Sequence, residues 1–176
     1  MNTTRAGSKM TQLSRKQIVQ SWKERLTKHG QTQGFFITLD TNKTSIAENN
    51  ARVQNRMIDL TPKVRLFLKR LDEYCYRRRL NMKEEHLHLV TPFSYEVGTG
   101  NGLLHFHILA AHNGSVKRSA EEVEMWAHHN WEKLCGSRMP STSVHVRDIG
   151  NIEKTLRYMT KQTNKLSWNS GELNMQ

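Results

Sequence analysis

The sequence predicts an α+β fold in which helices pack on a central antiparallel sheet. Segments with helical and strand patterns follow one another along the 176 residues in the order α-β-α-β-β-α-β-α. The two adjacent strand patterns are joined by residues 98–102 (GTGNG), a loop typical of a β-hairpin, whose strands are antiparallel. The length suits one domain, which we expect over residues 13–166, with flexible ends at residues 1–12 and 167–176.

Two helices are predicted from signals at both ends. Ser14 can cap a helix that Gly30 ends. Ser119 and Glu122 form a capping box before an apolar periodic segment that Gly136 ends.

Two further helices have a clear start. Thr61-Pro62 predicts an N-cap followed by proline in the first turn, and an apolar stripe that includes Cys75 follows, so we expect this cysteine in the core. Asn151 caps a last helix that runs to about Lys165.

Four segments have strand character. Residues 35–39 (FFITL) are aromatic and β-branched, and residues 87–97 and 103–110 flank the hairpin loop. Residues 144–148 form a short final strand, whereas residues 40–55 are polar and predict a loop, with a helical end to this segment as the alternative.

The charge distribution indicates a polyanionic partner. The chain has 27 Lys and Arg against 16 Asp and Glu, a net charge of +11. Residues 1–80 hold 17 basic and 6 acidic side chains, while residues 81–176 hold 10 of each. A basic surface attracts phosphates through counterion release, so nucleic acid is favoured over a merely solvated surface. The predicted helix after Pro62 carries several of these cations: Lys63, Lys69, Arg70, Arg77, Arg78 and Arg79.

Other classes of protein are disfavoured. No apolar run approaches the roughly 20 residues that cross a bilayer, and the first residues lack a secretory h-region. Cys75 and Cys135 are isolated, which argues against a disulfide scaffold or a zinc ribbon. We therefore expect a cytoplasmic protein with no membrane partner.

A candidate metal site lies in the hairpin. His105 and His107 alternate with apolar residues on one strand and so point to the same face. If the turn is centred between Gly100 and Asn101, Glu96 falls opposite His105, within about 5 Å between Cβ atoms. Two imidazoles and one carboxylate suit Mn²⁺, Mg²⁺ or Zn²⁺.

The histidine pair is a weak signal when taken alone. A chain with nine histidines often contains such a pair by chance, and His86-Leu87-His88 is a second one. Half-buried histidines without a metal are the plain alternative. His29, His112 and His145 are expected to be solvated or to lie behind the ligands.

The last predicted helix carries a candidate nucleophile. Tyr158 shares a face with Lys154, Lys161 and Lys165, at spacings of one helical turn, so its phenol is well placed to meet a phosphate. A phenol attacks poorly unless cations or a metal stabilise the phenolate. An amphipathic tyrosine at a helix boundary, with no chemical role, remains the alternative. Gln162 is either a further metal contact or a surface amide.

Together these features resemble the HUH endonucleases, most closely the single-tyrosine rolling-circle replication initiators (Rep proteins) of plasmids and small phages. Residues 36–40 (FITLD) look like the family's first motif, His105-Phe106-His107 matches its His-hydrophobic-His motif, and residues 158–161 (YMTK) match its Tyr-x-x-Lys motif. The resemblance spans residues 35–165.

The resemblance implies an RRM-like antiparallel sheet of about five strands and a DNA nicking and joining activity. Tyr158 would form a 5′-phosphotyrosine intermediate with Lys161 beside the phosphate, and His105, His107 and Glu96 would hold Mn²⁺ or Mg²⁺. The origin DNA, single-stranded or a hairpin, would contact Lys154, Lys165 and the cations of residues 63–79. A chain of this length has no room for a helicase domain, so a helicase of the bacterial or archaeal host is an expected partner.

The chain departs from the family pattern at two points, and other functions stay open. Asp40 stands where many relatives have Thr, and no second tyrosine follows Tyr158 by four residues. A single-tyrosine transposase of a small insertion sequence fits the Tyr158/Gln162 spacing, with residues 85–89 (EHLHL) as its metal strand. A relaxase is a more distant alternative. A non-catalytic RNA- or DNA-binding module would instead expose aromatic side chains on the sheet.

Overall fold

The computed structural model describes residues 14–44, 50–76, 88–97, 103–136 and 140–161. It confirms the α+β fold. The strands β1 (Gln33–Thr44), β2 (Phe93–Val97), β3 (Leu103–His112) and β4 (Val144–Asp148) form one sheet in the order β2-β3-β1-β4. All three pairings are antiparallel. Within the described residues the sheet thus has four strands, where about five were expected.

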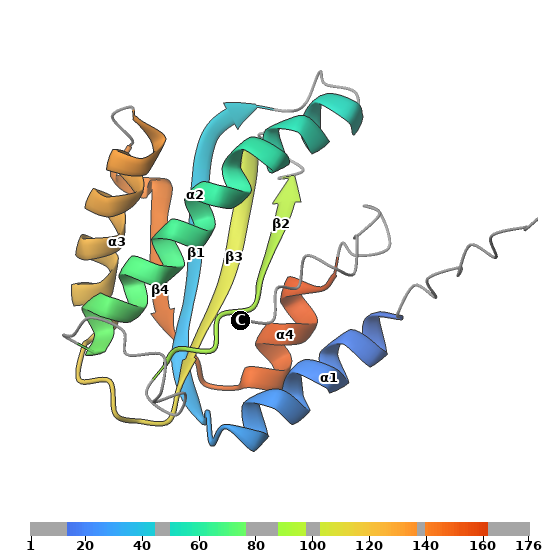
Figure 1. Ribbon diagram of the computed structural model, residues 1–176, viewed down its shortest axis with the longest axis vertical. Helices are drawn as coiled ribbons and strands as arrows, with labels where there is room; N and C mark the ends of the chain where they lie inside the picture. Colours follow the sequence, from blue (N-terminus) through green and yellow to red (C-terminus); the bar gives the residue numbers. More distant parts are fainter. Residues whose placement is uncertain (1–13, 45–49, 77–87, 98–102, 137–139, 162–176) are drawn as a thin grey trace, which may run out of the picture.

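Among the residues that the structure describes, four α-helices cover the two faces of this sheet. They are α1 (Arg15–Lys28), α2 (Asn50–Tyr76), α3 (Ala120–Cys135) and α4 (Ile152–Met159). Figure 1 shows α2 running across the sheet, α3 beside β4, and α1 next to α4. Among the described residues, no helix has both the length and the apolar character that crossing a membrane requires.

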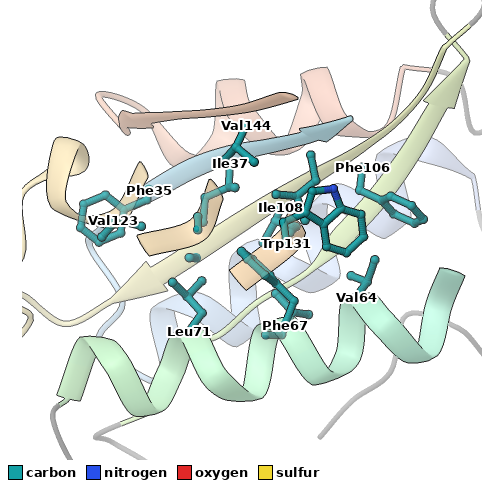
Figure 2. Packing of buried hydrophobic residues seen from close by; sticks show 14 of the residues in the cluster. Phe35, Ile37, Val64, Phe67, Leu71, Phe106, Ile108, Val123, Trp131 and Val144 are labelled. Carbon is teal, nitrogen blue, oxygen red and sulfur yellow. The ribbon is translucent and has the colours of Figure 1, made fainter. Parts of the chain in front are cut away.

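The larger hydrophobic cluster lies between the sheet and α2 and α3. Alternate residues of the central strands point into it, among them Phe35 and Ile37 of β1 and Phe106 of β3 (Figure 2). The fully buried Trp131 of α3 packs edge-on against Phe106, and its Nε1 donates to the carbonyl of Asp40 over 2.7 Å. This cluster fixes β1 and β3 as the rigid centre of the molecule.

A second cluster lies on the opposite face. Phe36 of β1 and Leu109 of β3 point into it, between the strand residues that face the first cluster. Helix α1 contributes an apolar stripe that includes Trp22, and α4 contributes Leu156 and Met159. The sheet therefore separates two cores, and the smaller one holds α1 and α4 in place.

The starts of α1, α3 and α4 follow the predicted caps, whereas the last helix, predicted to run to about Lys165, ends at Met159. Ser14 and Gln17 form a capping box on α1, and Ser119 forms one with its third helical residue on α3. The side chain of Asn151 accepts a hydrogen bond from the backbone of Lys154 at the start of α4. Gly136 ends α3 with φ 69°, a left-handed conformation that glycine adopts without strain.

The prediction of a helix start at Thr61-Pro62 is wrong. Helix α2 begins at Asn50 and continues through Pro62, although proline removes one hydrogen bond of the helix. The burial of Leu60 and Thr61 just before it, and of Val64 just after it, stabilises the helix on both sides of that missing bond. The loop predicted over residues 40–55 is shorter than expected, because β1 runs to Thr44.

Both cysteines are free thiols. Cys75 is buried in the larger cluster as predicted, and burial together with the nearby Asp72 carboxyl raises the pKa of its thiol to about 12. Several sequence predictions lie outside the described residues: the flexibility expected at both ends, the hairpin loop 98–102, Arg77 to Arg79, His86, Gln162 and Lys165.

Candidate functional site

The register of the hairpin agrees with the prediction. Glu96 of β2 lies directly opposite His105 of β3, and Ser94 lies opposite His107. On the other side of β3, Asp40 of β1 pairs with His105. Because side chains opposite each other in a sheet share a face, Glu96, His105 and Asp40 form one row across three strands.

His107 is buried and hydrogen-bonded on both sides of its ring. Its Nε2 lies 3.1 Å from Oε2 of Glu96, and its Nδ1 lies 3.2 Å from the hydroxyl of Thr38. Burial lowers the pKa of His107, although the hydrogen bond to Glu96 opposes this effect. The neutral imidazole satisfies both contacts by donating from Nε2 and accepting at Nδ1.

His105 is held from the opposite side. Its Nδ1 hydrogen-bonds Oδ1 of Asp40, and its ring is stacked parallel to that of His107 with 6.4 Å between the centroids. A carboxylate on one ring nitrogen fixes the orientation of an imidazole. From the sequence, Asp40 stood out only as a departure from a family motif, and this contact was not predicted. The alternation within FITLD was an available signal, since it places Phe36, Thr38 and Asp40 on one face.

Tyr158 lies next to this histidine pair. Its ring packs edge-on against His107, with centroids 5.4 Å apart, and edge-on against Phe36 at 5.8 Å. The side chain is still 41% exposed, so the phenol can be reached from solvent. The buried Leu156 and Met159 orient α4 so that Tyr158 projects over the sheet.

Lys161 connects the tyrosine to the hairpin. Its Nζ lies 2.9 Å from Oε1 of Glu96 and 4.2 Å from the centroid of the Tyr158 ring. Partial burial lowers the pKa of Lys161, but its contacts with Glu96 and Tyr158 outweigh that effect and the net pKa is raised. Lys161 is therefore an ammonium ion at neutral pH, held between a carboxylate and a phenol.

Helix α1 fixes the end of α4 that carries Tyr158. The guanidinium of Arg15 donates to the carbonyl of Arg157 and to the hydroxyl of Thr160, 3.3 Å away in the latter case. Further along the helix pair, Lys23 forms an ion pair of 2.7 Å with Glu153. These contacts hold both ends of α4 against α1.

The other cations that the sequence predicts as DNA contacts lie on two helices, α2 and α4. Lys63, Lys69 and Arg70 belong to α2, whose apolar stripe packs on the face of the sheet opposite Tyr158. DNA contact by that helix stays a prediction. Lys154 is exposed on α4, one turn before Tyr158.

The second histidine pair is represented by His88 alone. Its Nδ1 lies 2.8 Å from Oδ2 of Asp72 of α2, and the other oxygen of that buried carboxyl accepts from the backbone of Leu89. His88 is thus bonded to the helix that covers the opposite face of the sheet from Tyr158.

Neither the arrangement of side chains nor the comparisons with known proteins identifies a family. Among the described residues, no group of three or more His, Cys, Asp or Glu side chains is arranged as a metal-binding cluster. Searches against protein-family models, curated proteins and solved structures gave no significant match to this chain.

Proposed function

We propose that this protein is a metal-dependent enzyme that nicks and rejoins single-stranded DNA through a covalent bond to Tyr158. The observation that carries the proposal is the position of Tyr158, whose exposed ring contacts His107 while Lys161 bridges it to Glu96. A nucleophile, a cation and a set of imidazole and carboxylate groups thus meet on one face of the sheet. Initiation of rolling-circle replication is the role that the resemblance to the HUH endonucleases favours.

The chemistry follows from these groups. The Tyr158 oxygen attacks the scissile phosphorus, a bond forms between them, and the bond from phosphorus to the 3′ oxygen breaks. The phenolic proton is lost to solvent and the departing 3′ oxygen takes one up, so that a 3′ hydroxyl and a 5′-phosphotyrosine result. Because one phosphoester replaces another, the reverse step can rejoin the strand. The Lys161 ammonium stabilises the negative charge of the phenolate and of the phosphate.

The donor groups fit a divalent metal by their chemistry. Two imidazole nitrogens and one carboxylate lie on one face of β2 and β3, supplied by His105, His107 and Glu96. Asp40 of β1 hydrogen-bonds Nδ1 of His105 and so orients its ring. These ligands suit Mn²⁺ or Mg²⁺, which would polarise a non-bridging oxygen of the phosphate. His107 and Glu96 hydrogen-bond each other in the structure, so binding of an ion between them requires that this hydrogen bond be exchanged for ligand bonds.

The test is a covalent-adduct assay. The protein is incubated with Mn²⁺ and a pool of random single-stranded oligonucleotides, labelled at either the 3′ or the 5′ end. We expect a band that survives SDS and carries the 3′ label but not the 5′ label, since the tyrosine retains the 5′ phosphate. Tyr158→Phe should abolish it, and Tyr74→Phe, a change in a tyrosine that stacks on Trp126 on the other side of the sheet, should not.

The metal ligands can be tested in the same assay. His105→Ala should abolish the adduct, whereas His88→Ala, in the second histidine pair, should leave it intact. The opposite result would favour the alternative metal strand of a transposase. An adduct that persists in Tyr158→Phe would show that the proposed nucleophile is wrong.

A non-catalytic nucleic-acid module is less well supported. Such a module stacks bases on aromatic side chains exposed on its sheet. Phe35, Phe36 and Phe106 are all less than 10% exposed, so the aromatic rings of the two central strands are not available for stacking.

A further inference from the structure

In the described part of the chain, no helix covers one end of the sheet face that carries Tyr158. Helix α4 lies against β2 and β3, and α1 packs over Phe36 and Leu109. No side chain of β4 belongs to this second cluster, and both β4 side chains on this face, His145 and Arg147, are exposed. Their register confirms the placement, because His145 lies opposite Thr38 and Arg147 opposite Phe36.

Arg147 points back toward the candidate nucleophile. Its guanidinium carbon lies 4.9 Å from the centroid of the Phe36 ring, and the same ring contacts Tyr158. The guanidinium is thus separated from the tyrosine by a single aromatic side chain. Phe36 is buried, and its ring attracts the planar guanidinium that lies over it.

Within the described part of the chain, no carboxylate forms an ion pair with the guanidinium of Arg147. Two other cations near the site have partners there, since Lys161 is paired with Glu96 and Arg15 is bonded to the end of α4, whereas Lys154 of α4 is exposed. Neither Arg147 nor His145 forms an ion pair with any described residue. An exposed guanidinium without a carboxylate partner is a good ligand for phosphate, which it can bind through two parallel hydrogen bonds.

The charges on this face of the sheet favour one direction for a bound polyanion. Two carboxylates, Asp40 and Glu96, lie at the end of the face near His105. Over β4, Arg147 lies level with Phe36 and His145 level with Thr38, which are four and two positions along β1 from Asp40. A polyanion bound at Tyr158 is therefore attracted along the sheet toward β4 rather than past the carboxylates.

We infer that Arg147 and His145 bind the phosphodiester backbone of the single strand held at Tyr158, which therefore crosses β1 toward β4. This inference rests on the proposed function and adds a binding surface to it. It also separates the path of the cleaved strand from the cations of α2, which lie on the other face of the sheet.

The experiment measures binding without chemistry. In full-length Tyr158→Phe protein, the affinity for a fluorescent oligothymidylate of about 20 nucleotides is measured by anisotropy over a range of salt concentrations. Adding Arg147→Gln should weaken binding about tenfold and reduce the salt slope by about one unit, and Arg147→Lys should restore part of the loss. His145→Ala should weaken binding by a smaller factor. Lys133→Gln, which removes an exposed cation from α3, is the matched control and should leave binding unchanged.

The outcomes separate this inference from the nicking proposal. If the double variant Arg147→Gln/His145→Ala binds within about twofold of its parent, the surface over β4 is not a DNA site, whatever the adduct assay gives. If binding falls as expected but no protein forms an adduct, the binding surface stands and the proposed nicking activity fails. Circular dichroism spectra of the variants should match that of the parent, since both side chains are exposed.

Discussion

Lys161 and Glu96 form an ion pair that ties the residues just after α4 to the hairpin strand β2, with 2.9 Å between Nζ and Oε1. The same Lys161 lies over the Tyr158 ring, so it contacts both Glu96 and the candidate nucleophile, as His107 also does. This relationship gives the first prediction.

Lys161→Gln should slow adduct formation about 100-fold, because it removes a charge that stabilises the phenolate and the phosphate. Single-turnover kinetics with the labelled oligonucleotide measure this rate. The midpoint of urea unfolding should change little, since a partly exposed ion pair contributes little to stability. A variant that reacts as fast as the parent would mean that Lys161 has no part in the chemistry. Lys28→Gln, at the end of α1, is the control.

Arg15→Gln should loosen α4 without unfolding the sheet. The substitution removes the bonds from the guanidinium to the Arg157 carbonyl and the Thr160 hydroxyl, and hydrogen bonds from a charged donor contribute about 2 kcal/mol. Hydrogen exchange should become faster in α4 while β1 and β3 stay protected. Equal protection of α4 in Arg15→Gln and in the exposed control Lys16→Gln would contradict this role of Arg15.

Gly34→Ala should destabilise the protein by about 3 kcal/mol. A Cβ at Gly34 would lie 2.6 Å from the carbonyl oxygen of Ala110 and 2.9 Å from Cα of Ala111, and these backbone atoms of β3 cannot move aside easily. At Gly150 a Cβ would meet no atom within 4 Å, so Gly150→Ala should change the free energy of unfolding by less than about 0.5 kcal/mol. Urea unfolding of both variants makes the comparison. Similar values for the two would show that β1 and β3 can separate at Gly34.

His112 should make the protein less stable in mild acid. Burial lowers its pKa below the usual value of about 6.5, although the nearby Asp148 opposes the shift. As the pH falls, the unfolded chain therefore takes up the proton on His112 before the folded protein does. The contribution of the neutral His112 to the free energy of unfolding is complete above pH 6.5 and is lost as the pH falls from there toward the folded pKa. Urea unfolding from pH 7.5 down to pH 5 measures the slope, which should be shallower in His112→Gln. An identical slope in the variant would show that another group is responsible.

Short-range sequence patterns were sufficient to predict most of the fold. The capping box at Ser119, the left-handed Gly136 and the placement of Glu96 opposite His105 all follow from short-range rules, because each depends on residues close together in the chain. The helix start at Pro62 was misplaced because tertiary packing outweighed a local signal. His112 was expected to be solvated or behind the ligands; it is 4% exposed, buried in the sheet where β3 meets β1.

The candidate site could be predicted only in part. Nothing local places Asp40 beside His105, since the contact joins residues 65 positions apart, and the same holds for Arg147 over Phe36. Both contacts depend on the strand order, which brings β1 between β3 and β4. The alternation of each strand indicates which face a side chain takes, but not which neighbour it meets.

The outer edge of β4 is closed to other strands. The backbone N–H of Val146 donates to a carboxylate oxygen of Glu124 from α3, over 2.7 Å, instead of facing solvent unpaired. An edge blocked in this way resists the addition of a foreign β-strand, so the molecule avoids joining sheet to sheet with its own copies at this side. Val144 and Val146 of β4 pack into the larger cluster while His145 and Arg147 are exposed on the other face, and a concentrated solution of the protein should not grow fibrils from this edge.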